Sequence, residues 1–183
     1  PSVEEARPSH CPRCGVASRP VGGRLQLHGH GLCRREVLGP ATPDEMPTRQ
    51  ENQVRRYRCV PCGAVITVVP QEILARRRYS ASAIGFALAL WGLALATVAT
   101  VRMRINPAKI RGFGATTNWA TLLRWARAVQ SNALFPSVLK PAPGATLREV
   151  AASAAATLAA RADPMSRGLA LATRAFFGAA QVA

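Results

Sequence analysis

The chain has few acidic residues and almost no lysine. Nine of its 183 residues are aspartate or glutamate, against 24 lysines and arginines, which leaves a formal net charge of +15. Such an excess favours an anionic partner, either nucleic acid or an acidic membrane surface. Lys109 and Lys140 are the only lysines, and with the high alanine content this indicates GC-rich coding, which raises arginine for reasons unrelated to binding. GC-rich coding does not explain the shortage of acids, so the charge argument stands.

The shortage of acids also bears on catalysis. No aspartate or glutamate lies between Glu72 and Glu149, and only Glu149 and Asp163 follow Glu72. Phosphoryl transfer by two metal ions needs a cluster of carboxylate ligands, which these segments cannot supply. A catalytic zinc would need an open coordination position, and we interpret the three histidines as surface residues rather than ligands: His10, His28 and His30. We therefore expect that the protein is not an enzyme.

The start of the sequence lacks a basic segment followed by an apolar stretch. Residues 1–5 are polar and acidic, so we expect no signal peptide, and residues 1–10 are interpreted as a loose leader. Thiols kept in pairs for metal binding favour a reducing compartment. The sequence therefore predicts a cytoplasmic location.

Two short motifs carry the strongest signal, Cys11-Pro12-Arg13-Cys14-Gly15 and Cys59-Val60-Pro61-Cys62-Gly63. Each places two thiols on a tight turn, and the following glycine allows the backbone to take a positive φ. Two such pairs can supply four sulfurs in the tetrahedron that Zn²⁺ adopts in closed structural sites. We predict one structural zinc ion held by Cys11, Cys14, Cys59 and Cys62, with a disulfide or redox pair as the alternative. Cys33 is expected to be a lone, half-buried thiol.

Residues 11–70 are predicted to form a small β-rich zinc ribbon, whose core could not hold without its metal. The expected segments are a half-exposed strand, a turn, a returning strand, a proline-rich loop and a β-branched strand: 24–28, 29–31, 33–38, 39–49 and 64–69. Pro70 ends the last strand. An all-α domain and further helices are expected to follow, which makes the fold class α+β.

Residues 81–101 form an uncharged run about as long as a membrane span. Much of it is alanine, glycine, serine and threonine, which insert weakly, and arginines flank both ends, so that no orientation is specified. Gly92 divides the run into two short helices, and Ser80 can cap the first. We therefore predict a buried helical hairpin with its second helix over 94–105, and keep one membrane span at 81–101 as the alternative.

Basic and amide side chains mark two candidate DNA contacts. Residues 71–79 are predicted to be a hinge carrying Arg76, Arg77 and Arg78, either as a solvated charge run or as a phosphate contact. The helix that closes the 80–131 domain, capped by Thr116 or Thr117, is expected to bury five residues: Trp119, Leu122, Leu123, Ala126 and Val129. Its other side carries side chains of the kind that read bases in the major groove: Asn118, Thr121, Arg124 and Arg127.

The remainder of the chain carries no motif. Residues 132–144 contain proline and glycine and are interpreted as a linker. Residues 145–183 are predicted to form two C-terminal helices, the second starting at Asp163-Pro164 with Asp163 as its N-cap. We expect these helices to pack on the preceding domain or to mediate self-association.

The ordered combination of the two thiol motifs, the histidine–glycine stretch over 27–31 and the basic run over 76–80 resembles a known module. This module is the zinc ribbon plus helix-turn-helix at the N-terminus of insertion-sequence transposases, which also occurs in stand-alone bacterial proteins. The resemblance covers about residues 11–130. It implies a zinc ion on the four paired cysteines and sequence-specific contact with double-stranded DNA through a helix matching 118–129.

The chain departs from that module in two respects. The loop over 106–115 is longer than the turn of a helix-turn-helix, and the carboxylates of a nuclease core are missing. The leading hypothesis is therefore a non-catalytic DNA-binding protein, a transposase-related regulator, accessory protein or remnant. Two alternatives remain, a membrane-anchored zinc-ribbon protein and a zinc-dependent adaptor that docks other proteins on its C-terminal helices.

Overall fold

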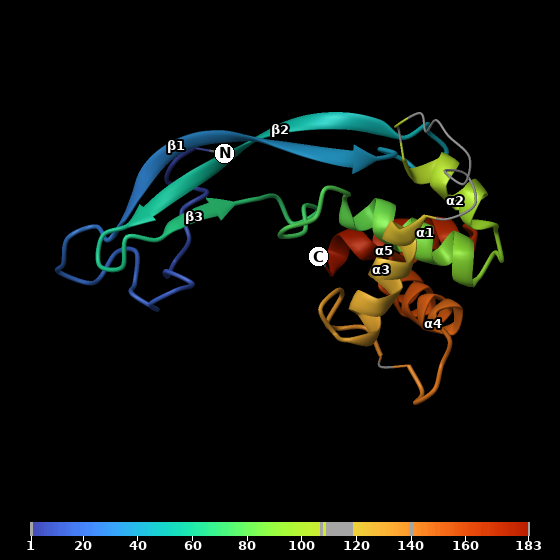
Figure 1. The fold of residues 1–183 in the computed structure, drawn as a ribbon. Helices are drawn as coiled ribbons and strands as arrows, with labels where there is room; N and C mark the ends of the chain where they lie inside the picture. Colours follow the sequence, from blue (N-terminus) through green and yellow to red (C-terminus); the bar gives the residue numbers. More distant parts are fainter. Residues whose placement is uncertain (1, 107, 109–118, 140, 183) are drawn as a thin grey trace. The chain divides into compact units, whose positions relative to one another are not determined.

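The computed structural model describes residues 2–106, 108, 119–139 and 141–182. Within them, a three-stranded antiparallel sheet precedes five α-helices (Figure 1), so the α+β class is confirmed. The elements are β1 Leu27–Gly39, β2 Thr48–Cys59, β3 Val65–Val68, α1 Ala81–Gly92, α2 Val98–Ile105, α3 Ala120–Gln130, α4 Leu147–Ala160, a 3₁₀ turn η1 Pro164–Ser166 and α5 Leu171–Gln181. Two compact units are described separately below: unit 1 comprises Pro1–Glu36 and Glu51–Pro70, and unit 2 comprises Val37–Gln50 and Gln71–Ala183.

The sheet has the order β1-β2-β3, and β2 and β3 pair antiparallel from Arg55 opposite Val68 to Arg58 opposite Val65. The expected turn over 29–31 is wrong, because β1 runs unbroken for 13 residues through it. Gly31 does take a positive φ of 82°, but the strand continues on both sides, so the freedom of glycine is used for a local distortion rather than a reversal.

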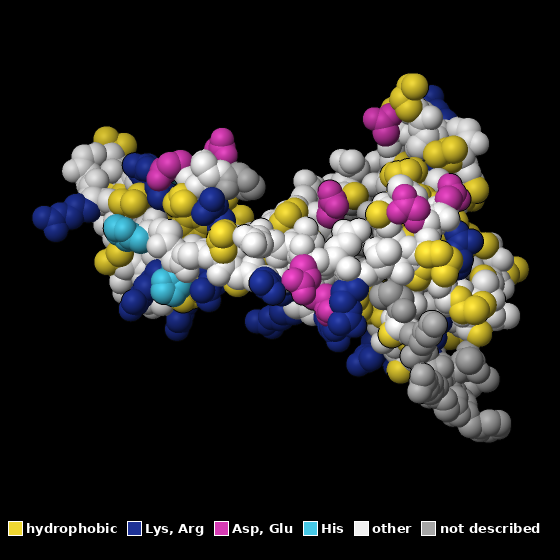
Figure 2. Space-filling model, turned by 90° about the horizontal axis from the view of Figure 1, so that it is seen from above, with side chains coloured by type: hydrophobic (Ala, Val, Ile, Leu, Met, Phe, Trp, Pro, Cys, Tyr) yellow, Lys and Arg dark blue, Asp and Glu magenta, His cyan; other side chains and the backbone are white. Residues whose placement is uncertain are grey.

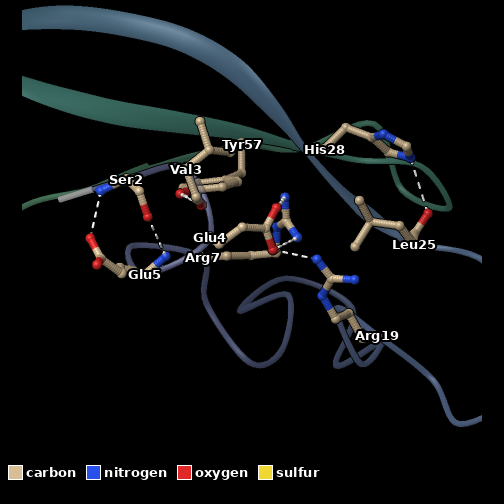
Figure 3. Close-up of polar contacts among 9 residues, drawn as sticks. All are labelled: Ser2, Val3, Glu4, Glu5, Arg7, Arg19, Leu25, His28 and Tyr57. Atoms are coloured by element: carbon tan, nitrogen blue, oxygen red, sulfur yellow. Dashed lines mark hydrogen bonds and ion pairs between the residues drawn. The ribbon is translucent and has the colours of Figure 1, made fainter.

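The described part of the predicted leader, residues 2–10, is not loose, because it packs on the sheet through Val3 (Figure 3). Tyr57 is fully buried, and its hydroxyl donates a 2.5 Å hydrogen bond to the Val3 carbonyl oxygen. A buried hydroxyl needs such an acceptor. Glu4 lies 2.7 Å from the Arg7 guanidinium and also pairs with Arg19, which ties the leader to the loop after the first thiol pair.

The end of the β1–β2 hairpin belongs to unit 2 rather than to the ribbon. There Leu38 forms an isolated parallel bridge with Tyr79, donating to the Arg78 carbonyl at 2.7 Å and accepting from the Ser80 amide at 3.2 Å. The Arg104 guanidinium donates to the Pro43 carbonyl at 2.6 Å. The predicted boundary between residues 70 and 71 is present, but two further boundaries were not predicted, because residues 37–50 of the predicted ribbon belong to unit 2.

The core of unit 2 is built around α1, which is buried on nearly every side and packs against α4 and α5. Three glycines bring these helices into backbone contact. A Cβ on Gly178 would lie 1.8 Å from the Leu158 carbonyl oxygen, and one on Gly92 would lie 2.4 Å from the Ala152 nitrogen. On Gly85 it would lie 2.5 Å from the Ala179 Cβ. The C-terminal helices are therefore part of this core and not a separate domain.

Two helix starts differ from those predicted. α2 begins at Val98 instead of residue 94, because Thr97 caps it by accepting from the Thr100 amide at 3.2 Å, and Leu95 before it has a φ of 54°. Asp163 does cap a turn, accepting from the Met165 amide at 2.8 Å, but only the short η1 follows. Glycine is a poor helix former, and Gly168 separates η1 from α5.

Residues 132–144 are not a bare linker. Leu134, Phe135 and Val138 are buried in the helical core, with Phe135 only 2% exposed. The connection between α3 and α4 therefore contributes apolar packing to unit 2.

The predicted division of 81–101 at Gly92 is confirmed, since α1 ends there and α2 follows after a turn. No helix within the described residues combines the length and the apolar character needed to cross a membrane.

Ser80 caps α1 as predicted, its hydroxyl accepting from the Ala83 amide at 3.1 Å. Ser80→Ala is expected to lower the free energy of unfolding by about 1 kcal/mol, because that amide loses its acceptor. Chemical denaturation followed by circular dichroism measures the change. Ser153→Ala, inside α4, is the control and should leave stability unchanged or slightly higher. Equal stability of Ser80→Ala and the wild type would contradict the capping role.

Candidate metal centre

The two thiol pairs share one local structure. In the first, the Cys11 amide donates to the Val16 carbonyl at 2.9 Å, and the Gly15 amide donates to the Cys11 carbonyl at 2.8 Å. The second repeats this pattern, from Cys59 to Ala64 and from Gly63 to Cys59, at 2.9 Å each. Gly15 and Gly63 have φ values of 72° and 67°, which is the conformation that the sequence predicted for them.

Gln26 joins the two pairs. Its amide donates to the Ser18 carbonyl and its carbonyl accepts from the Val60 amide, both at 2.9 Å. The backbone just before β1 is thereby fixed to the segment after the first pair and to the second pair itself. No sequence pattern identifies this role, because it uses only backbone atoms.

The four sulfurs converge, as predicted. Cys11 Sγ lies 3.7 Å from Cys62 Sγ, Cys14 Sγ lies 3.7 Å from Cys59 Sγ, and all four lie within 4.8 Å of one another. A tetrahedral ion with metal–sulfur bonds of about 2.3 Å has sulfur–sulfur edges of about 3.8 Å. A disulfide requires about 2.05 Å, and all four thiols are free. The cysteines are therefore placed to hold one metal ion.

The surroundings of the sulfurs suit thiolate ligands. Cys11 and Cys59 are buried beside Leu27. Amide hydrogen bonds to the Cys11 sulfur, first from Cys14 and then from Arg13, lower the pKa of Cys11 to about 6, and such donors stabilise a metal-bound thiolate. Burial raises the pKa of Cys59 to about 12, so this thiol releases its proton to solvent only when a cation binds the sulfur.

The other candidate ligands lie outside the cluster. Cys33 is half-buried, as predicted, and the metal-binding group found in the described residues contains only the four paired cysteines. His10, His28 and His30 are exposed. The Nε2 atom of His28 lies 3.0 Å from the Leu25 carbonyl oxygen (Figure 3).

The predicted DNA-contacting side chains of unit 2 are partly described. Arg124 and Arg127 of α3 are exposed, while Thr121 is half-exposed and accepts a 3.1 Å hydrogen bond from Arg124. In the hinge, Arg76 and Arg78 are exposed and Arg77 is half-buried. Asn118 and the proposed caps Thr116 and Thr117 lie outside the described residues.

The buried side of α3 matches the prediction in part. Trp119, Leu122, Ala126 and Val129 are buried, Leu123 is only half-buried, and Trp125 is buried although it was not predicted. Sequence reasoning missed Trp125, which takes part in an aromatic cluster with Tyr79 at 5.0 Å and Trp119 at 5.1 Å between ring centroids. This cluster fixes the end of the hinge against α3.

The pairing of α2 with α3 as a helix-turn-helix stays a prediction. Most of the segment between them lies outside the described residues, and α1 packs mainly with α4 and α5. No family model, curated protein or solved structure matches the chain. The likeness to transposase modules therefore depends on the residues of the chain alone.

Proposed function

We propose that the chain is a non-catalytic DNA-binding protein, with a structural zinc ion in unit 1 and a duplex-contacting helix, α3, in unit 2. A transposase-related regulator, accessory protein or remnant is the role that this combination favours. The observation that carries the proposal is the sorting of side chains on α3.

Zinc is the metal that best fits the donor set. Four thiolates in a tetrahedron are typical of structural Zn²⁺ sites, and soft sulfur ligands disfavour magnesium and calcium. Four protein ligands leave no position for water or substrate, so the ion would stabilise the fold of unit 1 rather than catalyse a reaction.

On α3, the side chains that pack in the core and the side chains that could contact DNA lie on different sides of the helix. Its apolar side chains are buried, whereas Arg124 and Arg127 point to solvent, and the helix contains no acid. Arg78 and Arg102 also lie close enough to Tyr79 to counter the rise that burial causes in its pKa. The Tyr79 ring itself contacts Trp125 on the buried side of α3. An exposed basic helix of this kind fits a duplex groove.

The adaptor alternative places protein docking on α4 and α5. Both helices bury surface against α1, so removal of residues 145–183 should unfold unit 2 rather than remove a docking surface. Self-association through these helices stays a prediction.

The test is duplex binding by the full-length, zinc-loaded chain. We expect a site to emerge from selection on random duplexes, with an affinity that falls steeply as salt rises. Arg124→Ala should cost about 1–3 kcal/mol and relax the preference at one base position, whereas Arg78→Ala should weaken all sequences alike. Arg167→Ala, an exposed arginine outside this surface, is the control. The absence of any mobility shift at low salt would contradict the proposal.

A further inference from the structure

We infer that unit 1 binds the phosphate backbone of double-stranded DNA through its own sheet. The surface is the open sheet face, made of His28 and His30 of β1 and Arg56 and Arg58 of β2. This inference rests on the proposed function and adds to it a second, sequence-independent contact in the metal-binding unit.

One face of the sheet is covered. Leu27, Tyr57 and Cys59 are fully buried on it. A Cβ on Gly29 would lie 3.1 Å from Val3 Cγ1, so Val3 of the leader lies on this side of β1, although Gly29 itself stays exposed. Because successive strand residues point to opposite faces, the residues next to these lie on the other side of the sheet.

The open sheet face follows from that alternation. His28 and His30 flank Gly29, and Arg56 and Arg58 flank Tyr57, so all four belong to the other side. That side is open at this end of β2, whereas Val54, in the same register farther back, is buried. His28, His30 and Arg58 are exposed, and Arg56 is half-buried. On β3, Thr67 opposite Arg56 and Val65 opposite Arg58 are also exposed.

One of these guanidinium groups lies beside Gly31. The Arg56 Nη2 atom lies 4.0 Å from the position that a Cβ on Gly31 would occupy. Arg56 therefore reaches from β2 toward β1, and its buried Nε has no hydrogen-bond partner among the described residues.

The negative charges of unit 1 lie elsewhere. It contains four glutamates against nine arginines. Glu4 and Glu5 belong to the leader, which covers the opposite face, Glu4 pairs with Arg7 and Arg19, and Glu51 lies 3.7 Å from Arg34. In Figure 2, histidine side chains of this unit are visible, with arginines beside them and at other places on the unit. Glu36, the fourth glutamate, shares the register of His28 and His30 but lies six residues beyond His30 on β1, so no acid lies within residues 28–30 or 56–58.

Duplex DNA fits this surface better than a single strand does. Proteins that bind single strands stack bases mostly on large aromatic side chains, and Tyr57, the one Phe, Tyr or Trp of unit 1, is buried. Two residues of a strand advance about 6.6 Å, more than the axial rise of about 3.4 Å between successive phosphates of one DNA strand. Arg56 and Arg58 can therefore meet two neighbouring phosphates of one strand.

The experiment measures the affinity of the full-length chain for a mixed-sequence duplex as a function of salt. Each lost phosphate contact lowers the slope of log K against log salt by about 0.9, so the double variant Arg56→Gln/Arg58→Gln should lower it by about 1.8. Arg34→Gln, on the same sheet but beside Glu51, should leave the slope unchanged. Zinc content and far-ultraviolet circular dichroism verify that each variant is folded.

The outcomes separate this inference from the proposed function. If the wild type binds the duplex and the double variant keeps the full slope, the sheet contact is overturned while the role of α3 stands. If the wild type binds no duplex, both fail. A double variant that loses only binding to a single-stranded oligonucleotide, or to vesicles containing phosphatidylserine, also overturns the inference, because the face would then serve another partner.

Discussion

Cys59→Ser is expected to abolish metal binding and unfold unit 1, while the helices of unit 2 stay folded. The Cys59 sulfur is fully buried and lies 3.7 Å from that of Cys14, so the variant loses one of four ligands at the centre of the site. Among the described residues, the fully buried members of the cluster around it are Cys11, Leu27 and Cys59, with a few half-buried side chains packed against them. A core of this size cannot offset the conformational entropy of ordering the chain without a metal, and the binding free energy of the ion is also folding free energy.

Metal analysis and amide exchange measured by NMR or mass spectrometry check this result. The wild type should carry about one zinc per chain and protect the amides of β2 and β3. Both features should be lost in Cys59→Ser and after chelation of the wild type. Cys33→Ser is the matched control, since Cys33 is half-buried and outside the cluster, and it should keep zinc and protection. Retention of protected strands in zinc-free Cys59→Ser would refute a structural role for the metal.

Gly178→Ala is expected to destabilise unit 2 by about 3 kcal/mol or more, at the upper end of what overpacking costs. The added Cβ would lie 1.8 Å from the Leu158 carbonyl oxygen and 3.0 Å from the Ala162 nitrogen. These are backbone atoms at the end of α4, so no side-chain rotation relieves the clash. α5 must move away from α4, and the buried contacts of α1 with both helices loosen.

Thermal denaturation of the helical signal measures this loss. Gly168→Ala is the matched control, because a Cβ there meets no atom within 4 Å and restricts the unfolded chain, which stabilises a protein by about 0.4–1 kcal/mol where the conformation permits. If Gly178→Ala and Gly168→Ala melt together near the wild-type temperature, the close helix contact at Gly178 is wrong.

The features that were predicted correctly from the sequence are those set by residues close to one another along the chain. A thiol pair with a following glycine forms its turn from five adjacent residues, and Ser80 caps α1 through an amide three residues away. The β-branched strand after the second pair and the apolar side of α3 depend likewise on short-range patterns. These features need no knowledge of which segments meet.

Long-range contacts account for the errors. The leader has the composition of a loop, and only the buried Tyr57 hydroxyl, 54 residues from Val3, explains why it packs. From the sequence alone, Gly178 is simply a residue of low helix propensity. Its role becomes clear only from the structure, where it lies against the backbone of Leu158. α1 is apolar on all sides because two helices from the end of the chain cover it, a partnership that periodicity within α1 cannot identify.

The two units alternate along the chain, and this limits how recombination could exchange one of them without the other. A recombination event that exchanged residues 1–70 as one cassette would also remove residues 37–50, and with them Leu38, which pairs with the chain around Tyr79. The remaining helices would lose that pairing and the acceptor of Arg104 at Pro43. The ribbon and the helices are therefore expected to be inherited together, since no single crossover point separates them cleanly.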